Sequence, residues 1–292
     1  MNTKSIGVVG AGFVGGAVAK GFEFLTEVKT YDINPERCSH TFLETVNCDF
    51  VFICLPTPMI SVEGGSANLS IMEGFFKEVA PIAKGNTSIY VIKSTVPIGT
   101  TARLSQEYGI KRLVHNPEFL REVSSVQDYF NPSRNIIGGS DKDSVERLNF
   151  LLRNRFPDVP CFTMGSNESE SVKYVANAFL ATKVIFFNEM YLLAEKLELD
   201  WDSVINGVIS DERIGKSHYD VPGPDGDFGY GKSCFPKDVN SLIATMEQNG
   251  IEPLLLKAGW EQNKRIRKNW DWATNPSAVS PQTKKDEKNE KH

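Results

Sequence analysis

A glycine-rich turn between two apolar segments constrains this chain more than any other feature of its sequence. Residues Ser5 to Gly10 form a nearly continuous apolar run, which is typical of a strand buried on both faces of a parallel sheet. The pattern Gly-x-Gly-x-x-Gly follows at Gly10 to Gly15, and residues Phe13 to Phe24 have helical character. A second strand is expected from Val28 to Tyr31, so this segment predicts a β-α-β unit.

In this position the three glycines predict a dinucleotide site. The first allows a tight turn, the second lets a pyrophosphate approach the backbone, and the third lets the helix pack against the strand. The amino terminus of the helix then faces the phosphates. The residues expected to contact the cofactor here are Gly10, Gly12, Phe13, Val14 and Gly15. A glycine turn that binds no ligand is the alternative.

Asp32 and Arg37 bear on which dinucleotide is bound. Asp32 lies about 20 residues after the glycines, where a carboxylate accepts hydrogen bonds from the ribose hydroxyls and repels a 2′-phosphate. This favours NAD over NADP. Arg37 could pair with a 2′-phosphate or stack on adenine, and it is also expected to contact the cofactor.

The apolar segments that follow continue the alternation of strands and helices. Strands are expected at Phe50–Leu55, Ser88–Ile92, Leu113–Val114 and Asn135–Ile137, with helices at Ile71–Ala83 and Lys142–Phe156. Alternation of this kind predicts an α/β fold, a Rossmann-type doubly wound parallel sheet. We expect this NAD-binding domain to occupy residues 1–165.

The second half of the sequence predicts a mostly α-helical domain at residues 166–275. Glu168 to Leu199 contains no Gly or Pro, which predicts a long central helix. Shorter helices are expected at Asp202–Ile209, Val239–Asn249 and Glu252–Trp270, with an irregular Gly/Pro-rich loop from Pro222 to Pro236. Residues 276–292 lack apolar periodicity and predict a disordered tail.

Composition excludes several classes of protein. The 292 residues carry 32 Lys plus Arg against 37 Asp plus Glu, and this net charge of -5 argues against a nucleic-acid partner. No apolar run approaches the roughly 18 residues of a membrane span, and no signal peptide is recognisable, so a cytoplasmic location is expected. The five cysteines are widely spaced without a Cys-x-x-Cys pair, so neither disulfides nor a metal site is expected.

The segment Gly229 to Asp238 brings a cysteine to the start of a probable helix. A helix amino terminus and the nearby Lys232 and Lys237 favour the thiolate form of Cys234. Asp238 lies one helical turn further and could serve as a base. Spacing alone also fits a structural cysteine that packs as a small apolar residue.

Polar residues in the long helix and at strand ends are further candidates. Lys173 and Asn177 lie on one helix face and could stabilise an alkoxide, although a solvent-exposed pair would have no such role. Glu118 and Glu122 follow a strand whose carboxyl end should face the cofactor, and either could be a base. The segments Ser94–Pro97 and Cys54–Pro58 follow other strands, with turn formation as the alternative role. His115 is interpreted as structural.

Together these segments resemble the UDP-glucose/GDP-mannose dehydrogenase family, NAD-dependent enzymes that oxidise a nucleotide-sugar alcohol through an aldehyde to a carboxylate. The matching blocks occur in the family's order at Gly10–Gly15, Leu55–Pro58, Lys93–Gly99, Asn116–Glu122, Ser171–Glu195 and Asp211–Asp238. They cover most of residues 5–265.

The resemblance implies roles for the candidate residues. Cys234 would capture the aldehyde as a thiohemiacetal, and a second hydride transfer would give a thioester that water releases. Lys173 and Asn177 match the oxyanion-stabilising pair, and Asp238 matches an aspartate that holds or activates water. The residues that would order water and move protons are Thr95, Glu118 and Glu122. Arg213 matches an arginine that reaches the substrate, commonly from a partner subunit.

The expected binding residues extend beyond the catalytic ones. Further cofactor contacts are expected from Pro56, Thr57, Ser94, Thr95, Glu122 and Lys237. The substrate, UDP-glucose or a related UDP- or GDP-sugar, is expected to contact Glu118, Phe119, Leu120, Lys173, Asn177, Arg213, Gly229, Gly231 and Cys234. A homodimer formed through the long helix is the expected assembly.

Three departures from the family pattern keep other functions open. The second Rossmann-like domain that usually grips the nucleotide is not expected here, because the sequence ends shortly after Trp272 with a polar tail. The stretch between Asp32 and Phe50 is shorter than usual, and Gly231-Lys232 replaces a double glycine. The alternatives are a single-step NAD-dependent dehydrogenase of the 3-hydroxy-acid type and a non-catalytic NAD-binding partner protein.

Overall fold

The computed structural model describes residues 3–120 and 125–281 and separates into two compact units. The first unit comprises Met1–Thr57 and Leu69–Lys173, and the second comprises Pro58–Asn68 and Tyr174–His292. The boundary expected at residue 165 therefore differs from the observed one at Lys173. The reason is that the first turn of the long helix packs on the first unit. Ser169 and Glu170 are buried there, and they form hydrogen bonds with His115 and Thr101, respectively.

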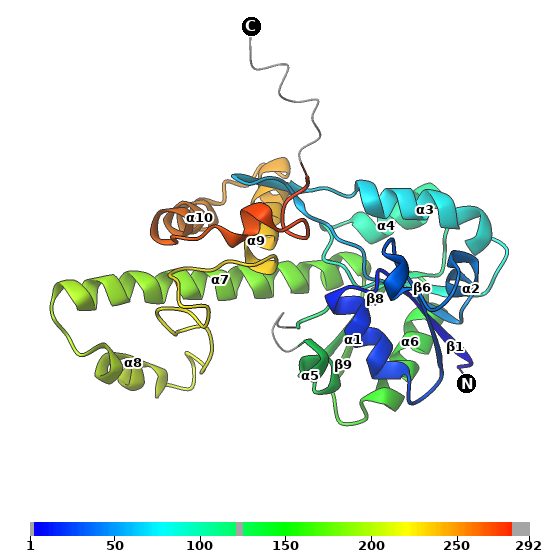
Figure 1. Ribbon diagram of the computed structural model, residues 1–292, viewed down its shortest axis with the longest axis horizontal. Helices are drawn as coiled ribbons and strands as arrows, with labels where there is room; N and C mark the ends of the chain where they lie inside the picture. Colours follow the sequence, from blue (N-terminus) through cyan, green and yellow to red (C-terminus); the bar gives the residue numbers. More distant parts are fainter. Residues whose placement is uncertain (1–2, 121–124, 282–292) are drawn as a thin grey trace, which may run out of the picture. The chain divides into compact units, whose positions relative to one another are not determined.

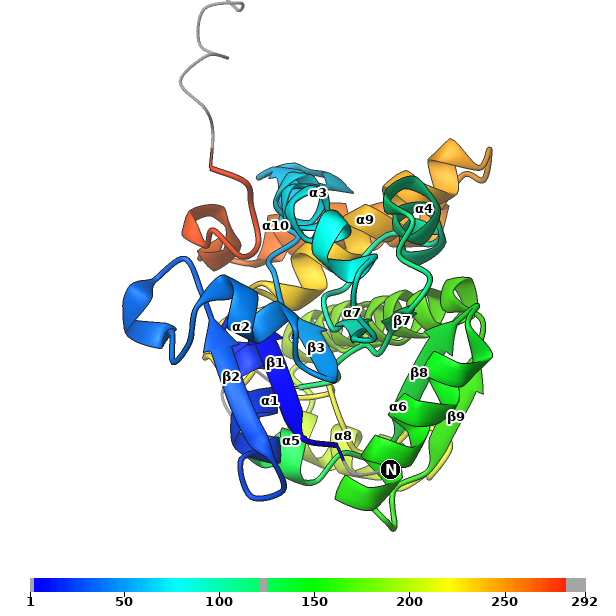
Figure 2. The same cartoon turned by 90° about the vertical axis from the view of Figure 1, so that its right-hand side faces the viewer.

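The first unit is built on a seven-stranded sheet in the order β2-β1-β3-β6-β7-β8-β9, part of which faces the viewer in Figure 2. The strands are β1 Ser5–Val9, β2 Glu27–Tyr31, β3 Phe50–Ile53, β6 Ile89–Ile92, β7 Leu113–His115, β8 Asn135–Gly139 and β9 Cys161–Met164. The sheet is mostly parallel, which confirms the predicted fold class. One pair departs from that prediction, because β8 runs antiparallel to β7, with Val114 opposite Gly139. The chain re-enters the sheet from the end at which β7 leaves it.

Helices cover both faces of this sheet. They are α1 Phe13–Phe22, α2 Phe42–Val46, α3 Ser70–Ala83, α4 Thr100–Tyr108, α5 Ser125–Phe130 and α6 Lys142–Arg155, with a short 3-10 helix η1 at Pro35–Arg37. Along β3, Phe50 and Phe52 enter one apolar core while Val51 and Ile53 enter another. Alternate side chains of a strand point to opposite faces, so this division shows that the sheet is doubly wound.

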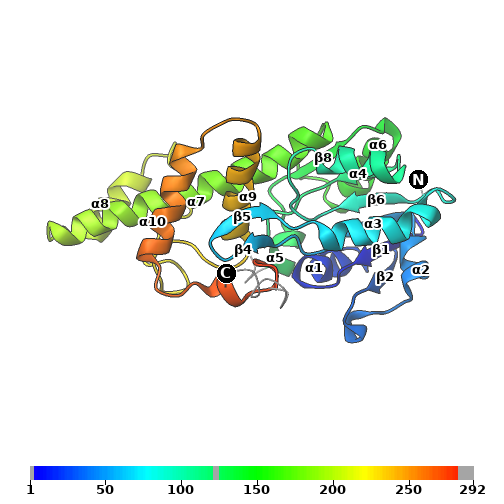
Figure 3. The same cartoon turned by 90° about the horizontal axis from the view of Figure 1, so that it is seen from above.

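The second unit is mostly helical and includes one small hairpin. Its helices are α7 Ser166–Lys196, which begins in the first unit and is the longest helix in Figure 1, α8 Trp201–Ile209, α9 Cys234–Gln248, α10 Leu254–Ile266 and the 3-10 helix η3 Asp271–Thr274. The hairpin pairs β4 Met59–Ser61 with β5 Gly64–Ala67 beside α9 (Figure 3). Met59, Trp260 and Trp272 lie in its apolar core. The sequence did not predict this hairpin.

Residues 276–281 belong to the packed structure, although the predicted tail began at 276. Ala278 and Val279 are buried in the core of the second unit. The backbone N–H of Met59 donates to the Ala278 carbonyl at 2.7 Å, and Ser280 N–H donates to the Met59 carbonyl at 2.9 Å. Two apolar residues are too few to form a periodic pattern, but they suffice to anchor this segment on β4. The rest of the predicted tail, 282–292, lies outside the described residues.

The described ranges lack membrane-spanning, metal-binding and disulfide features. Within 3–120 and 125–281, no helix has both the length and the apolar character required to cross a membrane. The same residues contain no group of three or more His, Cys, Asp or Glu side chains placed to hold a metal ion. All five cysteines lie in this part of the chain, and none forms a disulfide.

Candidate functional site

The glycine turn between β1 and α1 leaves room for a ligand at one of its glycines. Gly10 has φ 85°, and a Cβ there would lie 2.7 Å from the Cys54 carbonyl oxygen. A Cβ on Gly15 would lie 2.0 Å from the Gly10 carbonyl oxygen, so these two glycines are required by the turn itself. Among the described residues, a Cβ on Gly12 would meet only the Arg37 Nη1 atom, at 3.9 Å. The space above Gly12 is the place where a pyrophosphate can approach the backbone.

The first turn of α1 supports the same interpretation. Gly12 is the N-cap, and no side chain of the described residues caps the helix. The N–H groups of the first turn, which includes Phe13 and Val14, therefore lack a side-chain acceptor there and can bind a phosphate. The predicted cofactor residues Gly10, Gly12, Phe13, Val14 and Gly15 thus form a cradle that fits a dinucleotide.

Asp32 lies at the end of β2 and holds the glycine turn through a hydrogen bond with its backbone. Its Oδ2 accepts from the Ala11 N–H at 2.7 Å, and its Oδ1 accepts from the Asn34 N–H at 2.8 Å. Each carboxylate oxygen has a second lone pair, so ribose hydroxyls can still donate to it. Arg37 reaches over Gly12 from η1. Both residues lie beside the glycine turn, and their contacts with adenosine stay a prediction.

Two further segments that were predicted to contact the cofactor meet at the carboxyl ends of neighbouring strands. The Thr57 hydroxyl donates to the Thr95 carbonyl at 2.7 Å, and the Ser94 hydroxyl donates to the Leu55 carbonyl at 2.6 Å. These bonds join the loop after β3, which includes Pro56, to the loop after β6. The structure therefore brings together Pro56, Thr57, Ser94 and Thr95, as the prediction requires.

Glu118 and Lys173 form a buried ion pair in the first unit. The Lys173 Nζ lies 3.1 Å from Glu118 Oε1 and donates to the Glu118 carbonyl at 2.6 Å, with side chains 3% and 7% exposed. Glu118 Oε2 accepts from the Leu120 N–H at 2.5 Å, and the Phe119 ring lies 5.3 Å from the lysine nitrogen. Burial of this pair excludes the interpretation of Lys173 as a surface residue. Glu122 lies outside the described residues.

The sequence interpretation assigned no role to two buried neighbours of this pair. Lys93 donates to Asn116 Oδ1 at 2.9 Å, and burial lowers the pKa of Lys93 to about 8. Asn116 in turn donates to the Ile136 carbonyl at 2.6 Å. A lysine at the end of the apolar run of β6 was the available signal, since charged residues are rarely fully buried without a partner.

His115 was interpreted as structural without an identifiable partner, and the structure supplies one. Its Nδ1 lies 2.8 Å from the Ser169 hydroxyl at the start of α7. Burial lowers the pKa of His115 to about 3, so the ring is neutral near pH 7. The contact spans 54 positions of sequence, and no local pattern could have indicated it.

In the second unit Cys234 is the first residue of α9, as the sequence predicted. The helix begins five positions before the expected Val239. Pro236 does not prevent this earlier start, because it lies in the first turn, where a missing N–H is tolerated. Ser233 is the N-cap, with its hydroxyl 3.8 Å from the Cys234 Sγ. The half-buried thiol thus lies at the positive end of the helix dipole.

Asp238 is fully buried one turn after Cys234. Its Oδ2 accepts from the Asn177 side-chain amide at 2.6 Å, and its Oδ1 pairs with the Lys237 ammonium. Three predicted residues from α7 and α9 therefore meet. Lys237 forms an ion pair with Asp238, and its predicted contact with the cofactor stays a prediction.

The remaining predicted substrate residues have partners within the second unit. Arg213 is exposed, and its Nε donates to Asp211 Oδ1 at 2.9 Å. Lys183 of α7 donates to the carbonyls of Ile214 and Gly215, each at 2.9 Å, and so fixes the backbone that directly follows Arg213. A Cβ on Gly229 would lie 2.2 Å from Asn263 Oδ1, and one on Gly231 would lie 2.3 Å from Arg267 Nη2. These two glycines are required by side chains of the chain itself.

Comparison with known proteins agrees with this arrangement. Residues 38–155 match the NAD binding domain of the UDP-glucose/GDP-mannose dehydrogenase family, and residues 167–265 match the central domain of the same family. The structure of a UDP-glucose dehydrogenase from the hyperthermophilic archaeon Pyrobaculum islandicum is 32% identical, with a TM-score of 0.79 over 90% of this chain and 68% of that one. The chain belongs to the UDP-glucose/GDP-mannose dehydrogenase family. The predicted resemblance is confirmed, and so is NAD as the cofactor of the family domain that it matches.

Other relatives of this family member show how much of the family it spans. A UDP-glucose 6-dehydrogenase of Pseudomonas aeruginosa is 39% identical over 233 residues, which are 75% of this chain and 49% of that protein. The chain thus spans about half the length of the curated relatives it matches. A 3-hydroxyisobutyrate dehydrogenase of Mycobacterium tuberculosis shares the fold, with a TM-score of 0.70 at 17% identity over 91% of this chain and 94% of that one.

Proposed function

We propose that this protein is an NAD-dependent dehydrogenase that oxidises the 6-hydroxymethyl group of a nucleotide sugar, UDP-glucose or a related UDP- or GDP-sugar, to a carboxylate. The observation that carries the proposal is the start of α9, where Cys234 stands one turn before the buried Asp238 and Asn177 holds that carboxylate. Family membership and the UDP-glucose dehydrogenases among its relatives support the same substrate class. A cysteine in this setting serves covalent capture, which a single alcohol oxidation does not require.

The glycine turn, Asp32 and the loops at Thr57 and Thr95 would hold the cofactor. Bound NAD supplies a hydride acceptor, and the four-electron oxidation needs that acceptor twice. Lys173 donates from a buried position, so it stabilises the alkoxide formed when the substrate hydroxyl loses its proton. Glu118, which is paired with that lysine, is the carboxylate that we propose takes up a proton.

The second oxidation depends on the thiol of Cys234. The thiolate adds to the aldehyde carbon and forms a carbon–sulfur bond, which gives a thiohemiacetal. That carbon then gives up the second hydride to the cofactor while the thiohemiacetal hydroxyl loses its proton, and a thioester on Cys234 results. Water then attacks the carbonyl carbon and the carbon–sulfur bond breaks, so the thiol and a carboxylate are released. Asp238, held by Asn177 and Lys237, orients the water or accepts its proton.

The stoichiometry of NADH formation tests this proposal. Purified protein with NAD and UDP-glucose is expected to form two NADH per sugar consumed, and Cys234→Ala is expected to abolish formation of the second. Cys161→Ala is the matched control, because Cys161 is also half-buried and lies in β9 of the other unit. One NADH per sugar, unchanged in Cys234→Ala, would instead favour the single-step dehydrogenase. Absence of NADH with any UDP- or GDP-sugar, while NAD binds, would favour the non-catalytic partner protein.

We also propose that the protein forms a homodimer through α7. Val175, Phe179 and Phe186 are more than half exposed on this helix, and such apolar exposure is typical of a contact surface. Sedimentation equilibrium is expected to give the mass of two subunits, and Phe179→Glu with Phe186→Glu is expected to give the mass of one. A single-subunit mass for the unaltered protein would contradict the dimer.

A further inference from the structure

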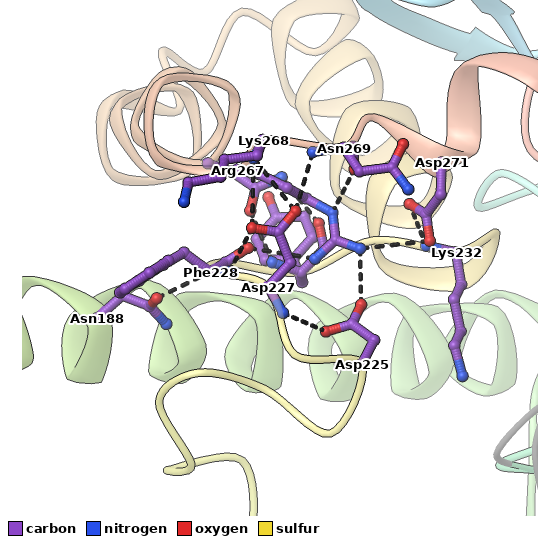
Figure 4. Close-up of polar contacts among 12 residues, drawn as sticks. Asn188, Asp225, Asp227, Phe228, Lys232, Arg267, Lys268, Asn269 and Asp271 are labelled. Atoms are coloured by element: carbon purple, nitrogen blue, oxygen red, sulfur yellow. Dashed lines mark hydrogen bonds and ion pairs between the residues drawn. The ribbon is translucent and has the colours of Figure 1, made fainter.

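Arg267 joins three segments of the second unit next to the cysteine loop. It is the C-cap of α10, and its side chain is only 2% exposed. Its Nη2 lies 2.6 Å from Asp225 Oδ2 and 3.3 Å from Asp271 Oδ2, while Nε donates to the Asn269 carbonyl at 2.8 Å (Figure 4). Its Nη1 donates to the Phe228 carbonyl at 3.2 Å. The guanidinium therefore binds the loop on one side and η3 on the other.

The backbone of the same loop is held at successive residues. Gly229 N–H donates to Asn188 Oδ1 of α7 at 3.0 Å. Tyr230 N–H donates to Asn263 Oδ1 at 2.7 Å, and the Asn263 amide donates back to the Tyr230 carbonyl at 3.0 Å. These bonds leave the loop little freedom before it reaches Cys234.

The last link lies two residues before the thiol. Lys232 has φ 62°, a left-handed conformation that side-chain-bearing residues rarely adopt, and its N–H donates to Asp271 Oδ1 at 3.0 Å. Figure 4 shows the Lys232 side chain pointing away from Arg267, so the backbone alone makes this contact. Such a conformation persists only where the surroundings impose it. Asp271, which Arg267 holds, is the group that does so here.

We propose that Arg267 is a positioning residue for Cys234: through Asp271 and Asp225 it fixes the backbone of Gly229–Ser233 and so keeps the thiol at the amino terminus of α9. At that end of a helix the dipole favours the thiolate. A loop that is released from Asp271 allows Lys232 to leave its left-handed conformation, and this movement draws Cys234 out of the first helical turn. The inference rests on the proposed function only for the use made of the thiol.

The thiol itself provides the test. Full-length protein is treated with iodoacetamide over a range of pH, and the rate of Cys234 alkylation is read from its peptide by mass spectrometry. Arg267→Lys keeps the charge but lacks the planar fork that reaches two carboxylates at once. Arg265→Lys is the matched control, because it makes the same exchange on the same helix at an exposed position.

In Arg267→Lys the midpoint of the alkylation profile is expected to rise by about one pH unit, with an alkylation rate about tenfold lower at neutral pH. Arg265→Lys is expected to match the unaltered protein. A rise in maximal rate without a shift in midpoint would mean only that the loop is more exposed, and it would overturn the proposal. An unchanged profile in folded Arg267→Lys would also overturn it.

Asp271→Asn keeps the test decisive if Arg267→Lys does not fold, because Asp271 is less buried and contacts Lys232 directly. The same midpoint shift is expected, and a folded Asp271→Asn with an unaltered profile would overturn the proposal. If the unaltered protein oxidises the sugar, Arg267→Lys is expected to lower kcat about 100-fold with little change in KM for NAD. If the unaltered protein forms no NADH, the proposed function fails while the alkylation result still stands.

Discussion

Two glycine-rich loops of this protein each lead into a helix that no described side chain caps, yet their glycines serve different purposes. The loop Gly10–Gly12 leads into α1, whose first turn contains Gly15, and Gly229–Ser233 precedes α9. A Cβ added at Gly12 would approach only Arg37 Nη1 among the described residues, at 3.9 Å. A Cβ added at Gly231 would lie 2.3 Å from both Arg267 Nη2 and Asp271 Oδ1. The first loop is open to a ligand, and the second is filled by the protein.

The difference shows that a glycine in a loop can be required either by a ligand or by other side chains of the protein. In the first loop a missing side chain leaves space for a cofactor phosphate next to backbone N–H groups. In the second loop the space is taken by charged side chains that fix the backbone before Cys234. Contacts within the chain require glycine at positions 229 and 231, and the predicted contact of Gly229 and Gly231 with the substrate stays a prediction.

The largest expected effect distinguishes Gly12 of the first loop from Gly15 in the first turn of α1. Gly15→Ala places a Cβ 2.0 Å from the Gly10 carbonyl oxygen, and backbone cannot move aside, so the free energy of unfolding is expected to fall by about 4 kcal/mol. Gly12→Ala is expected to leave stability within about 1 kcal/mol but to weaken NAD binding at least about tenfold. Urea unfolding and calorimetric titration with NAD measure the two effects. Equal NAD affinity in Gly12→Ala would show that the open space is not the cofactor site.

The second loop is tested by Gly231→Ala. The added methyl group displaces Arg267 and Asp271 from each other, so the free energy of unfolding is expected to fall by about 2 to 3 kcal/mol. In an Asp271→Ala background the same substitution is expected to be less destabilising, because one of the two clashing groups is gone. A double-mutant cycle by urea unfolding measures this coupling. Strict additivity would mean that the clash lies elsewhere.

Acid is expected to act on the two units in sequence. His115 of the first unit has a pKa of about 3 when folded and near 6.5 when unfolded, so unfolding takes up a proton between these values. Its contribution is complete above about pH 6.5 and is lost as the pH falls, by about 2 kcal/mol between pH 7 and pH 5. His115→Gln is expected to remove this slope while keeping a partner for Ser169, as measured by urea unfolding at the two pH values. A slope that persists in the variant would assign it to another group.

The Asp225 carboxyl of the second unit loses its contribution in the same direction as His115, but at lower pH. Burial alone would raise its pKa, but the hydrogen bonds from Arg267 and Asp227 outweigh burial and lower the pKa below its ordinary value of 3.8. Its contribution is therefore present above that value and is lost only as the pH falls through the lower folded pKa. The cysteine loop should thus outlast the His115 contact as acid is added.

The smallest expected effect concerns Lys232. Its φ of 62° costs a residue with a side chain about 1 to 2 kcal/mol, whereas glycine adopts it freely but loses more entropy on folding. Lys232→Gly is therefore expected to raise the free energy of unfolding by about 0.5 kcal/mol, measured by urea unfolding. Lys268→Gly, at an exposed position outside the helices, is the control and is expected to be neutral or destabilising. A loss of stability in Lys232→Gly would show that the lysine side chain contributes contacts of its own.

The sequence by itself determined the local architecture of this protein. The glycine turn between strand and helix, the long helix without Gly or Pro, and Cys234 at the head of a helix all follow from backbone preferences and from apolar periodicity, which act over a few residues. The doubly wound sheet follows from the same alternation. Features of this kind are readable because each depends on neighbours in the chain.

Only the tertiary structure decided which distant residues meet. The Lys173–Glu118 pair spans 55 positions and the Asn177–Asp238 bond spans 61, and the hairpin Met59–Ala67 joins the second unit although it lies within the sequence of the first. The antiparallel direction of β8 and the position of Arg267 in the space beside Gly231 were equally unpredictable. The physical reason is that packing of whole elements fixes these contacts, and a local pattern cannot specify what will lie against a buried polar group once the chain has folded.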